Sequence, residues 1–453
     1  GLTSASGAPG GGSAGGTGAP GVPGVATRSG PGVTAKEVYV GLIYDKNAGA
    51  LNQATGGGAI TSGDSKQNET AIIDDINHHG GVGGRKLVPV FAQFDSTSSQ
   101  TLDQQYAAVC QQFTQDNPKV FAVLGAGAAN TDSYRQCISK AGVVMLSDDL
   151  PILDAADFAR YPALIEQGYA NVDRLAAYHV QPLVEQNYFT PWNTVTGQPA
   201  PTGTVKVGIL TYDDKVFSSA VDGFLVPALK RLGYQPQVAK ISQVNTASDY
   251  SSQTAAVQAA ELSFAQNGVT HIIPFESNGG LSEFFLATAR SQRYYPRYGI
   301  SSASGFQALL DSKLVDANQL TGTVGYGWIP AIDLHAQYNT DNGPYSNAAR
   351  RYCLKVMKDH SISFTSGNAQ AIALGECDAL YLIKTVLDKL SGPVTAGTFV
   401  ASAEGLGSSY ENPAGIGQEF RPGRHDPSNK AYHWKFFSDC TCFRYDGALH
   451  TIP

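Results

Sequence analysis

Two series of apolar segments, each interleaved with amphipathic segments, constrain the fold of this chain more than any other feature. The first series starts with the apolar run at residues 38–44 and the second with the run at 205–210. The segments between such runs carry apolar residues every three or four positions, which is the spacing of one helix face. Strands connected through helices lie parallel in a sheet that helices cover on both faces. The sequence therefore predicts an α/β protein with two units of similar size and order.

The predicted elements follow one another at short intervals. In the first unit we expect strands at 38–44, 87–93, 120–124 and 143–146, with helices ending near 77, over 102–113 and over 134–141. In the second unit we expect strands at 205–210, 237–241, 270–275 and 297–301, with helices over 217–232, 249–266 and 280–292. His78, His79 and Gly80 are predicted to close the first helix rather than to bind a ligand. After these come a strand at 325–328, helices around 345–359 and 368–390, and an aromatic, β-rich end.

The residues before the first strand have a different composition. Residues 1–32 are nearly all Gly, Ala, Ser, Thr and Pro, and such a segment buries too little surface to offset its ordering entropy. We expect residues 1–36 to form a flexible tether, with a scar of the expression vector as the alternative. The formal net charge is −7 and there is no clustered Lys/Arg face, so nucleic acid is not an expected partner.

The cysteine count predicts a disulfide framework. Six cysteines allow fifteen pairings of three bridges, and an even number in a chain with such a tether favours full pairing. We expect sequence neighbours to pair: Cys110 with Cys137, Cys353 with Cys377, and Cys440 with Cys442. The alternative for the last pair is half of a metal site with His433 or His425. That spacing matches no common zinc pattern, so the sequence predicts no metal.

The candidate ligand contacts are the residues that follow the predicted strands, because ligands of open parallel sheets bind beyond the carboxyl ends of the strands. In the first unit these residues are Tyr44, Asp45, Ala126, Gly127, Ala128, Asn130, Ser147, Asp148 and Asp149. In the second unit they are Tyr212, Phe217, Glu276, Ser277, Asn278 and Ser302. The backbone N–H groups of the small-residue turn at 125–131 are suited to a carboxylate or another anion.

The same residues support a catalytic site less well than they support a ligand-binding site. The turn from Gly125 to Gly127 is typical of a dinucleotide site, but Asn130 stands where the third glycine is needed. Asp148 and Asp149 would form an acid/base pair, yet adjacent carboxylates at a strand end more often are solvated or cap a helix. The sequence contains no P-loop, HExxH or Gly-x-Ser-x-Gly motif. We therefore expect that the protein binds no cofactor and is not an enzyme.

One segment carries a family resemblance. Residues 77–87, Asn-His-His-Gly-Gly-Val-Gly-Gly-Arg-Lys-Leu, resemble the N-x-x-GG-(I/V)-x-G-(R/K)-K-(I/L) turn of type I periplasmic binding proteins. These are the leucine/isoleucine/valine-binding-protein-like receptors of ABC importers. Asp95 and Ser147 end strands in the matching order, and Phe217 matches an aromatic position of the second half. The resemblance is clear over about residues 37–330 and looser beyond.

The resemblance implies two Rossmann-like lobes joined by a three-segment hinge, with a small-molecule ligand in the cleft between them. Lobe one would comprise residues 37–165 and 330–410, and lobe two residues 166–329 and 411–453. It also implies an ABC permease as partner and a monomer outside the cell. The end of the chain, from 421 to 443, resembles actinobacterial members that are held to the membrane only by a lipid anchor.

The ligand does not follow from the resemblance. Asp148 and Asp149 occupy a segment that is usually small and rich in hydroxyls, and the acidic contact for an α-ammonium near Ser302 is missing. Glu276 is the substitute that the sequence offers. We expect a polar, cationic or aromatic ligand, such as an amino acid or related metabolite, rather than an ordinary branched-chain amino acid. A sensor for a signalling partner and an enzyme on the same fold are the alternatives.

Overall fold

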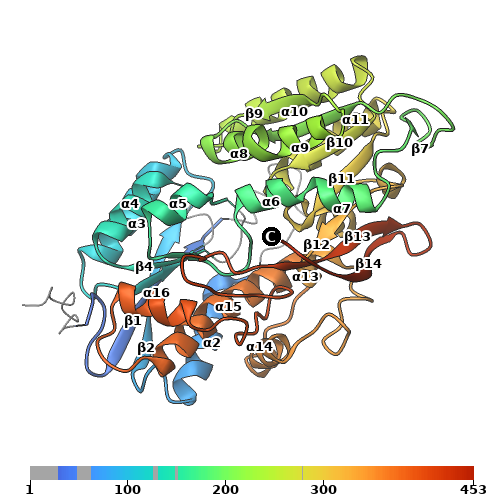
Figure 1. Ribbon diagram of the computed structural model, residues 1–453. Helices are drawn as coiled ribbons and strands as arrows, with labels where there is room; N and C mark the ends of the chain where they lie inside the picture. The colour runs from blue at the N-terminus through green and yellow to red at the C-terminus, as the bar shows by residue number, and fades with distance from the viewer. Residues whose placement is uncertain (1–28, 48–62, 126–130, 148–151, 278) are drawn as a thin grey trace, which may run out of the picture.

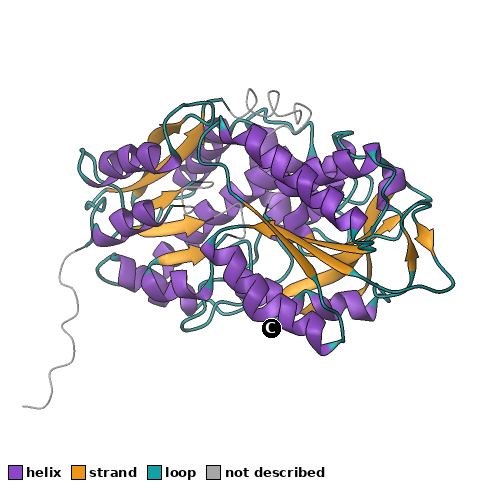
Figure 2. Cartoon of the chain, turned by 90° about the horizontal axis from the view of Figure 1, so that it is seen from above, coloured by secondary structure: helices purple, strands orange, loops and turns teal. Residues whose placement is uncertain are grey.

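The computed structural model describes residues 29–47, 63–125, 131–147, 152–277 and 279–453, and their strands form two large sheets (Figure 1). We call each sheet with the helices packed on it a unit. Helices lie on both sides of the sheets, as the view from above shows (Figure 2). The prediction of an α/β fold with two sheet units is confirmed.

The first sheet has the strand order β2-β1-β3-β4-β5, and all its neighbouring strands are parallel. Its strands are β1 (Glu37–Asp45), β2 (Lys86–Phe94), β3 (Ala122–Leu124), β4 (Val144–Ser147) and β5 (Leu164–Glu166). The helices between them are α2 (Ser65–His78), α3 (Leu102–Thr114), α4 (Asp132–Lys140) and α5 (Ala155–Arg160). The carboxyl ends of all five strands therefore lie along one edge of this sheet.

Alternate residues of β1 pack on opposite faces of the first sheet. Val40 and Leu42 join the core cluster under α2, while Ile43 joins the cluster that holds Phe113 of α3. Gly41 lies against the Phe113 ring, where a Cβ would come 3.0 Å from ring atoms, so a larger residue would have to displace the ring. The helices α14 (Ala348–Asp359), α15 (Gly367–Lys389) and α16 (Ala396–Glu404) complete the α2 side.

The second sheet has the order β14-β13-β12-β11-β10-β8-β9. Five of its strands are parallel: β8 (Val207–Tyr212), β9 (Gln237–Ile241), β10 (His271–Phe275), β11 (Arg297–Ser301) and β12 (Val324–Gly327). Antiparallel β13 (Lys430–Phe437) and β14 (Cys442–Thr451) extend it. Its main helices are α8 (Lys215–Ala220), α9 (Val226–Arg231), α10 (Asp249–Gln266), α11 (Gly280–Ser291) and α12 (Phe306–Asp311).

The described chain passes between the two units three times. It leaves the first sheet after β5, returns to it after β12 through α13 (Pro330–Asp333), and goes back to the second sheet between α16 and β13. Each unit is therefore built from segments that are far apart in the sequence. Among the described residues, no helix is both long and apolar enough to cross a bilayer.

The segment after the first crossing is folded against the second unit. The sequence pattern had indicated only a polar stretch there. It contains α6 (Val172–Tyr178), α7 (Val180–Glu185) and a hairpin of β6 (Trp192–Asn193) and β7 (Gln198–Pro199). Trp192 donates its indole N–H to the Tyr295 carbonyl at 2.9 Å, and the Arg297 guanidinium lies over the indole. Arg297 is the first residue of β11, so the hairpin lies at the amino ends of the strands, at the right edge of Figure 1.

The predicted disulfides are confirmed. Cys110 of α3 is bonded to Cys137 of α4, and Cys353 of α14 to Cys377 of α15. Cys440 and Cys442 are bonded to each other in the turn between β13 and β14. Because this bond uses both thiols, the alternative in which they form half of a metal site is wrong.

Two shorter predictions can also be compared with the structure. Helix α2 ends at His78 and is capped by His79, and both rings approach backbone carbonyls of the preceding turn, so the prediction that they close the helix is confirmed. Of the predicted tether, residues 1–28 lie outside the described residues. Residues 29–36 contact the first unit: Gly30 donates to the Val394 carbonyl, and Gly32 accepts from the N–H of Tyr39.

Candidate ligand-binding site

The loops beyond the carboxyl ends of the two sheets meet at one edge of the molecule. The backbone N–H of Leu102, the first residue of α3, donates to the carbonyl oxygen of Asn245 at 3.3 Å. Asn245 follows β9 of the second sheet. Burial and, after it, the nearby Asp45 carboxylate raise the pKa of Tyr250, so the end of β1 also lies near the start of α10. The residues that follow β1 and β2 thus lie near those that follow β9 in the other unit.

Four of the predicted contact residues come together at the ends of β8 and β10. The rings of Tyr212 and Phe217 meet edge to face with centroids 5.3 Å apart. The Tyr212 hydroxyl donates to the Ser277 carbonyl at 3.4 Å. Burial, followed by the Glu276 carboxylate, raises the pKa of Tyr212 well above its ordinary value, so this hydroxyl stays protonated. The group combines an aromatic surface with one buried acid.

The Glu276 carboxylate lies at the N-terminus of α11. It accepts hydrogen bonds from the backbone N–H groups of Leu281 and Ser282 at 2.7 and 3.1 Å, and from the Ser282 hydroxyl. The positive end of the helix dipole favours a carboxylate there. Burial nevertheless raises the pKa of Glu276 to about 7, against the opposing effect of these bonds. Gly279, with φ +70°, turns the chain into the helix at a point where a Cβ would lie 2.6 Å from the Ser304 carbonyl oxygen.

Ser302 is positioned by a different network. Its hydroxyl donates to the Asp333 carboxylate at 2.7 Å and accepts from the Trp328 N–H at 2.8 Å. The Tyr445 hydroxyl donates to the same Asp333 oxygen at 2.5 Å. Burial raises the pKa of Asp333 to about 7, and the hydrogen bonds from Tyr445 and Ser302 limit that rise. The structure therefore places Ser302 against the start of the second crossing, bonded within the protein.

In the first unit the predicted residues are spread over the sheet end. Tyr44 meets Phe91 edge to face at 6.2 Å, and the Lys66 ammonium lies 5.1 Å from its ring centroid. Asp45 accepts from the backbone N–H groups of Asn47 and Ser96. Ser147 is buried opposite Glu166 in the sheet.

Seven of the predicted contacts lie outside the described residues. They are Ala126, Gly127, Ala128, Asn130, Asp148, Asp149 and Asn278.

Solved structures of ABC-transporter substrate-binding proteins are similar to this chain over nearly all its length. A solute-binding protein from Rhodopseudomonas palustris, in complex with p-hydroxybenzoic acid, has a TM-score of 0.62 at 12% identity, covering 92% of this chain and 98% of that one. One from Aeropyrum pernix has a TM-score of 0.62 at 13% identity, covering 92% and 97%. One from Desulfitobacterium hafniense, in complex with Leu, has 0.57 at 15% identity, covering 91% and 100%. The chain has the type I periplasmic-binding-protein fold. No protein-family model and no curated protein matches the sequence.

The fold that the 77–87 turn implied is therefore confirmed. That turn joins α2 to β2: the Asn77 side chain accepts from the Leu87 N–H at 2.8 Å and donates to the Leu87 carbonyl at 2.9 Å. Gly81 has φ +73°, and a Cβ there would lie 1.9 Å from the Arg85 carbonyl oxygen. The turn at residues 77–87 thus needs Asn77 and Gly81 for structural reasons.

A polar cluster after β1 and β2 was missed by the sequence-based choice of contacts. The Asp95 carboxylate accepts from Thr97 and from the Asn47 side chain, at 2.7 and 2.9 Å, and these bonds lower the pKa of Asp95. The rule that selected Asp45 at the end of β1 also applies to Asp95 at the end of β2. It applies equally to the loop after β9, where Asn245 and Tyr250 lie.

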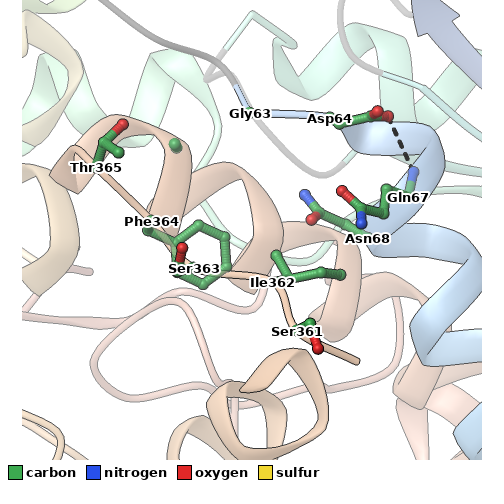
Figure 3. Close-up of a pocket in the computed structure, with 10 residues that line it drawn as sticks. Gly63, Asp64, Gln67, Asn68, Ser361, Ile362, Ser363, Phe364 and Thr365 are labelled. Atoms are coloured by element: carbon green, nitrogen blue, oxygen red, sulfur yellow. Dashed lines mark hydrogen bonds between the residues drawn. The ribbon is translucent and has the colours of Figure 1, made fainter. Parts of the chain in front are cut away.

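A pocket of about 280 Å³ lies in the first unit between the start of α2 and the connection from α14 to α15 (Figure 3). Ile362 and Phe364 of that connection face Gln67 and Asn68 of α2, and Asp64 caps the helix by accepting from the Gln67 N–H at 3.0 Å. None of the sequence-predicted contact residues that the structure describes lines this pocket.

Proposed function

We propose that this protein is an extracellular solute-binding protein that captures a small polar molecule, an amino acid or related metabolite, and presents it to an ABC permease. The observation that carries the proposal is the meeting of the two units beyond the carboxyl ends of their strands, at Leu102 and Asn245. Ligands of parallel sheets bind at these ends. The similarity to substrate-binding proteins supports the same conclusion.

In this proposal the two units are lobes that close on the ligand. Lobe one comprises residues 37–165 and 330–410, and lobe two residues 166–329 and 411–453. A ligand that contacts both lobes binds the closed arrangement more tightly than the open one, and this difference in affinity drives closure. The three crossings supply the hinge. The sheet membership of the strands and the packing of α14–α16 on the first sheet support this division.

The ligand contacts that we propose are the strand-end residues predicted from the sequence, including those outside the described ranges. Tyr212 and Phe217 offer aromatic edges, and Glu276 offers a carboxylate next to them. A ligand with an aromatic or cationic part suits this set, because a cation near Glu276 would favour its ionised form. The Leu and p-hydroxybenzoic acid complexes are properties of the similar proteins and do not identify this ligand.

The setting of the protein is part of the same proposal. We infer that it is a monomer outside the cell, held to the membrane only by a lipid anchor. An ABC permease is the partner that the closed form would meet. The three disulfides support an oxidising compartment, since such bonds persist outside the cytoplasm.

A thermal-shift screen of amino acids, polyamines, aromatic acids and nucleobases tests the proposal. At roughly a thousandfold excess over Kd, a ligand adds about 4 kcal/mol to the free energy of unfolding. Tyr212→Ala should reduce this shift, whereas Val195→Ala should leave it unchanged, since Val195 lies 74% exposed on the β6–β7 hairpin. The proposal fails if no compound shifts the transition. It also fails if mass spectrometry shows that the binding compound is consumed.

A further inference from the structure

Three side chains from distant parts of the sequence meet on the second unit: Glu185, His433 and His450. Within the described ranges they form a group whose potential ligand atoms all lie within 4.8 Å of one another. Glu185 is the last residue of α7, His433 lies on β13, and His450 lies on β14. In Figure 1, α7 lies beside the β13–β14 hairpin. The group therefore joins this short helix to the C-terminal hairpin.

Both imidazoles face the same carboxylate oxygen. His433 Nε2 lies 2.9 Å from Glu185 Oε2, and His450 Nδ1 lies 3.8 Å from it. The two rings are stacked with centroids 4.2 Å apart and an interplanar angle of 23°. Each imidazole therefore brings one ring nitrogen toward the same carboxylate oxygen.

An irregularity in the hairpin brings the two rings together. The β13–β14 register shifts between Tyr432 and His433: Tyr432 pairs with Leu449, whereas His433 pairs with Asp446. Two residues of β14, Gly447 and Ala448, are therefore left without a partner in the ladder. A regular ladder continued from the His433–Asp446 pair would place His450 opposite Asn429, four positions from His433. The shift instead places it opposite Ala431, two positions from His433. β-Bulges of this kind commonly re-aim a side chain.

The Glu185 carboxylate is oriented for this role from its other side. Gln181, one turn earlier on α7, donates to Glu185 Oε1 at 2.9 Å, and this leaves Oε2 directed at the histidines. Outer partners that fix a ligand in this way are typical of metal sites.

We propose that Glu185, His433 and His450 bind a divalent first-row transition metal ion of the Zn(II) or Cu(II) class. Two imidazole nitrogens and one carboxylate oxygen suit these ions, which bind such atoms at about 2.0–2.2 Å. The ligand atoms already lie close enough that small side-chain rotations reach these distances. Glu185 and His450 remain partly exposed, with side-chain exposures of 34% and 28%, so water has access to a fourth position.

The sequence predicted no metal because these ligands have no recognisable spacing. His433 and His450 are far from the known zinc patterns, and Glu185 lies in a different part of the chain. The group also differs from the one weighed in the sequence, since His425 pairs with Glu404 at 3.1 Å and the two thiols form a disulfide. The site does not depend on the proposed solute-binding function.

Calorimetric titration of tag-free, chelator-treated protein with Zn(II), and separately with Cu(II), tests the proposal. We expect one equivalent to bind to the unmodified chain. His433→Ala, His450→Ala and Glu185→Gln should each abolish the saturable event. His78→Ala, which removes an exposed histidine on α2, is the matched control and should bind one equivalent as before. Thermal unfolding of each metal-free variant shows whether it is folded.

A spectroscopic readout distinguishes these ligands from general surface binding. The electron paramagnetic resonance spectrum of the Cu(II) protein should show coupling to two nitrogen nuclei. Gln181→Ala, which only releases the carboxylate, should weaken binding about tenfold. If the folded variant that combines His433→Ala, His450→Ala and Glu185→Gln binds either ion as tightly as the unmodified chain, or if the unmodified chain binds neither, the proposal is wrong.

Discussion

The backbone N–H of Leu102 donates to the carbonyl oxygen of Asn245 across 3.3 Å, and this bond joins the two units beyond the carboxyl ends of their strands. Leu102 is the first residue of α3, where a helix has no internal partner for the N–H. The Leu102 N–H, which has no acceptor within α3, is therefore available to bond to the other unit. Residues on both sides of this contact come from loops that follow strands, which is where the proposed ligand would be held.

Replacing Leu102 by proline should weaken this contact without harming the helix. Proline suits the first helical position, and the preceding Thr101 already has the extended ψ of 157° that a following proline requires. The loss of one hydrogen bond, about 1 kcal/mol, corresponds to a roughly fivefold change in the ratio of closed to open forms. Small-angle scattering should show a larger radius of gyration for Leu102→Pro than for Leu102→Ala, which keeps the donor. Equal radii would contradict the role of this bond.

Glu276 should make the stability of the protein depend on pH. Burial raises the pKa of Glu276 to about 7 in the folded state, so the folded state holds this proton more tightly than the unfolded state does. Its contribution to stability is then complete at low pH and is lost as the pH rises through 7. Between pH 5 and 8 the loss is on the order of 2 kcal/mol. Urea unfolding of Glu276→Gln at both values should lack this part of the pH dependence; an unchanged dependence would show that Glu276 does not titrate there.

The buried hydrogen bond from Tyr445 to Asp333 should be important for stability. The Tyr445 hydroxyl lies 2.5 Å from an Asp333 carboxylate oxygen that also accepts a hydrogen bond from Ser302. Tyr445→Phe leaves a buried acceptor with one donor fewer, at a cost of about 1–3 kcal/mol. Tyr432→Phe is the matched control, since its half-buried ring stacks on Tyr445 with centroids 5.3 Å apart. Comparable losses for the two variants in chemical denaturation would contradict the assignment.

The disulfides should contribute unequally. Cys353 and Cys377 are 24 positions apart, whereas Cys440 and Cys442 are two apart. Closing the longer loop restricts the unfolded chain more, and it corresponds to about 3 kcal/mol against about 1 kcal/mol for the shorter one. Replacing Cys353 and Cys377 by alanine should therefore lower the free energy of unfolding more than the same change at Cys440 and Cys442. Equal effects would mean that loop closure is not the source of the stabilisation.

Elements whose length is typical of their class were predictable from the sequence. The helix expected over 249–266 is α10, Asp249–Gln266, and the strands expected over 237–241 and 297–301 are β9 and β11. A helix of 18 residues and an apolar run of five residues are told apart by their length. The helices α6 and α7 were missed because six or seven residues give fewer than two turns of pattern.

The sequence selected candidate contact residues but not the geometry around them. The rule of strand ends selected Glu276 and Ser302, but it did not show that Glu276 accepts from the N-terminus of α11 or that Ser302 donates to Asp333. Both partners come from other elements, whose packing is a property of the tertiary structure. The approach of Glu185 to His433 has the same origin, since 248 positions separate them.

The change in radius of gyration on ligand binding tests the central claim most directly. The compound with the largest thermal shift would be added to saturation, and small-angle scattering would be recorded with and without it. If two lobes close on a solute, the radius of gyration falls, and the compound is recovered unchanged. A radius that stays constant at saturation would contradict a solute-binding protein that closes on its ligand.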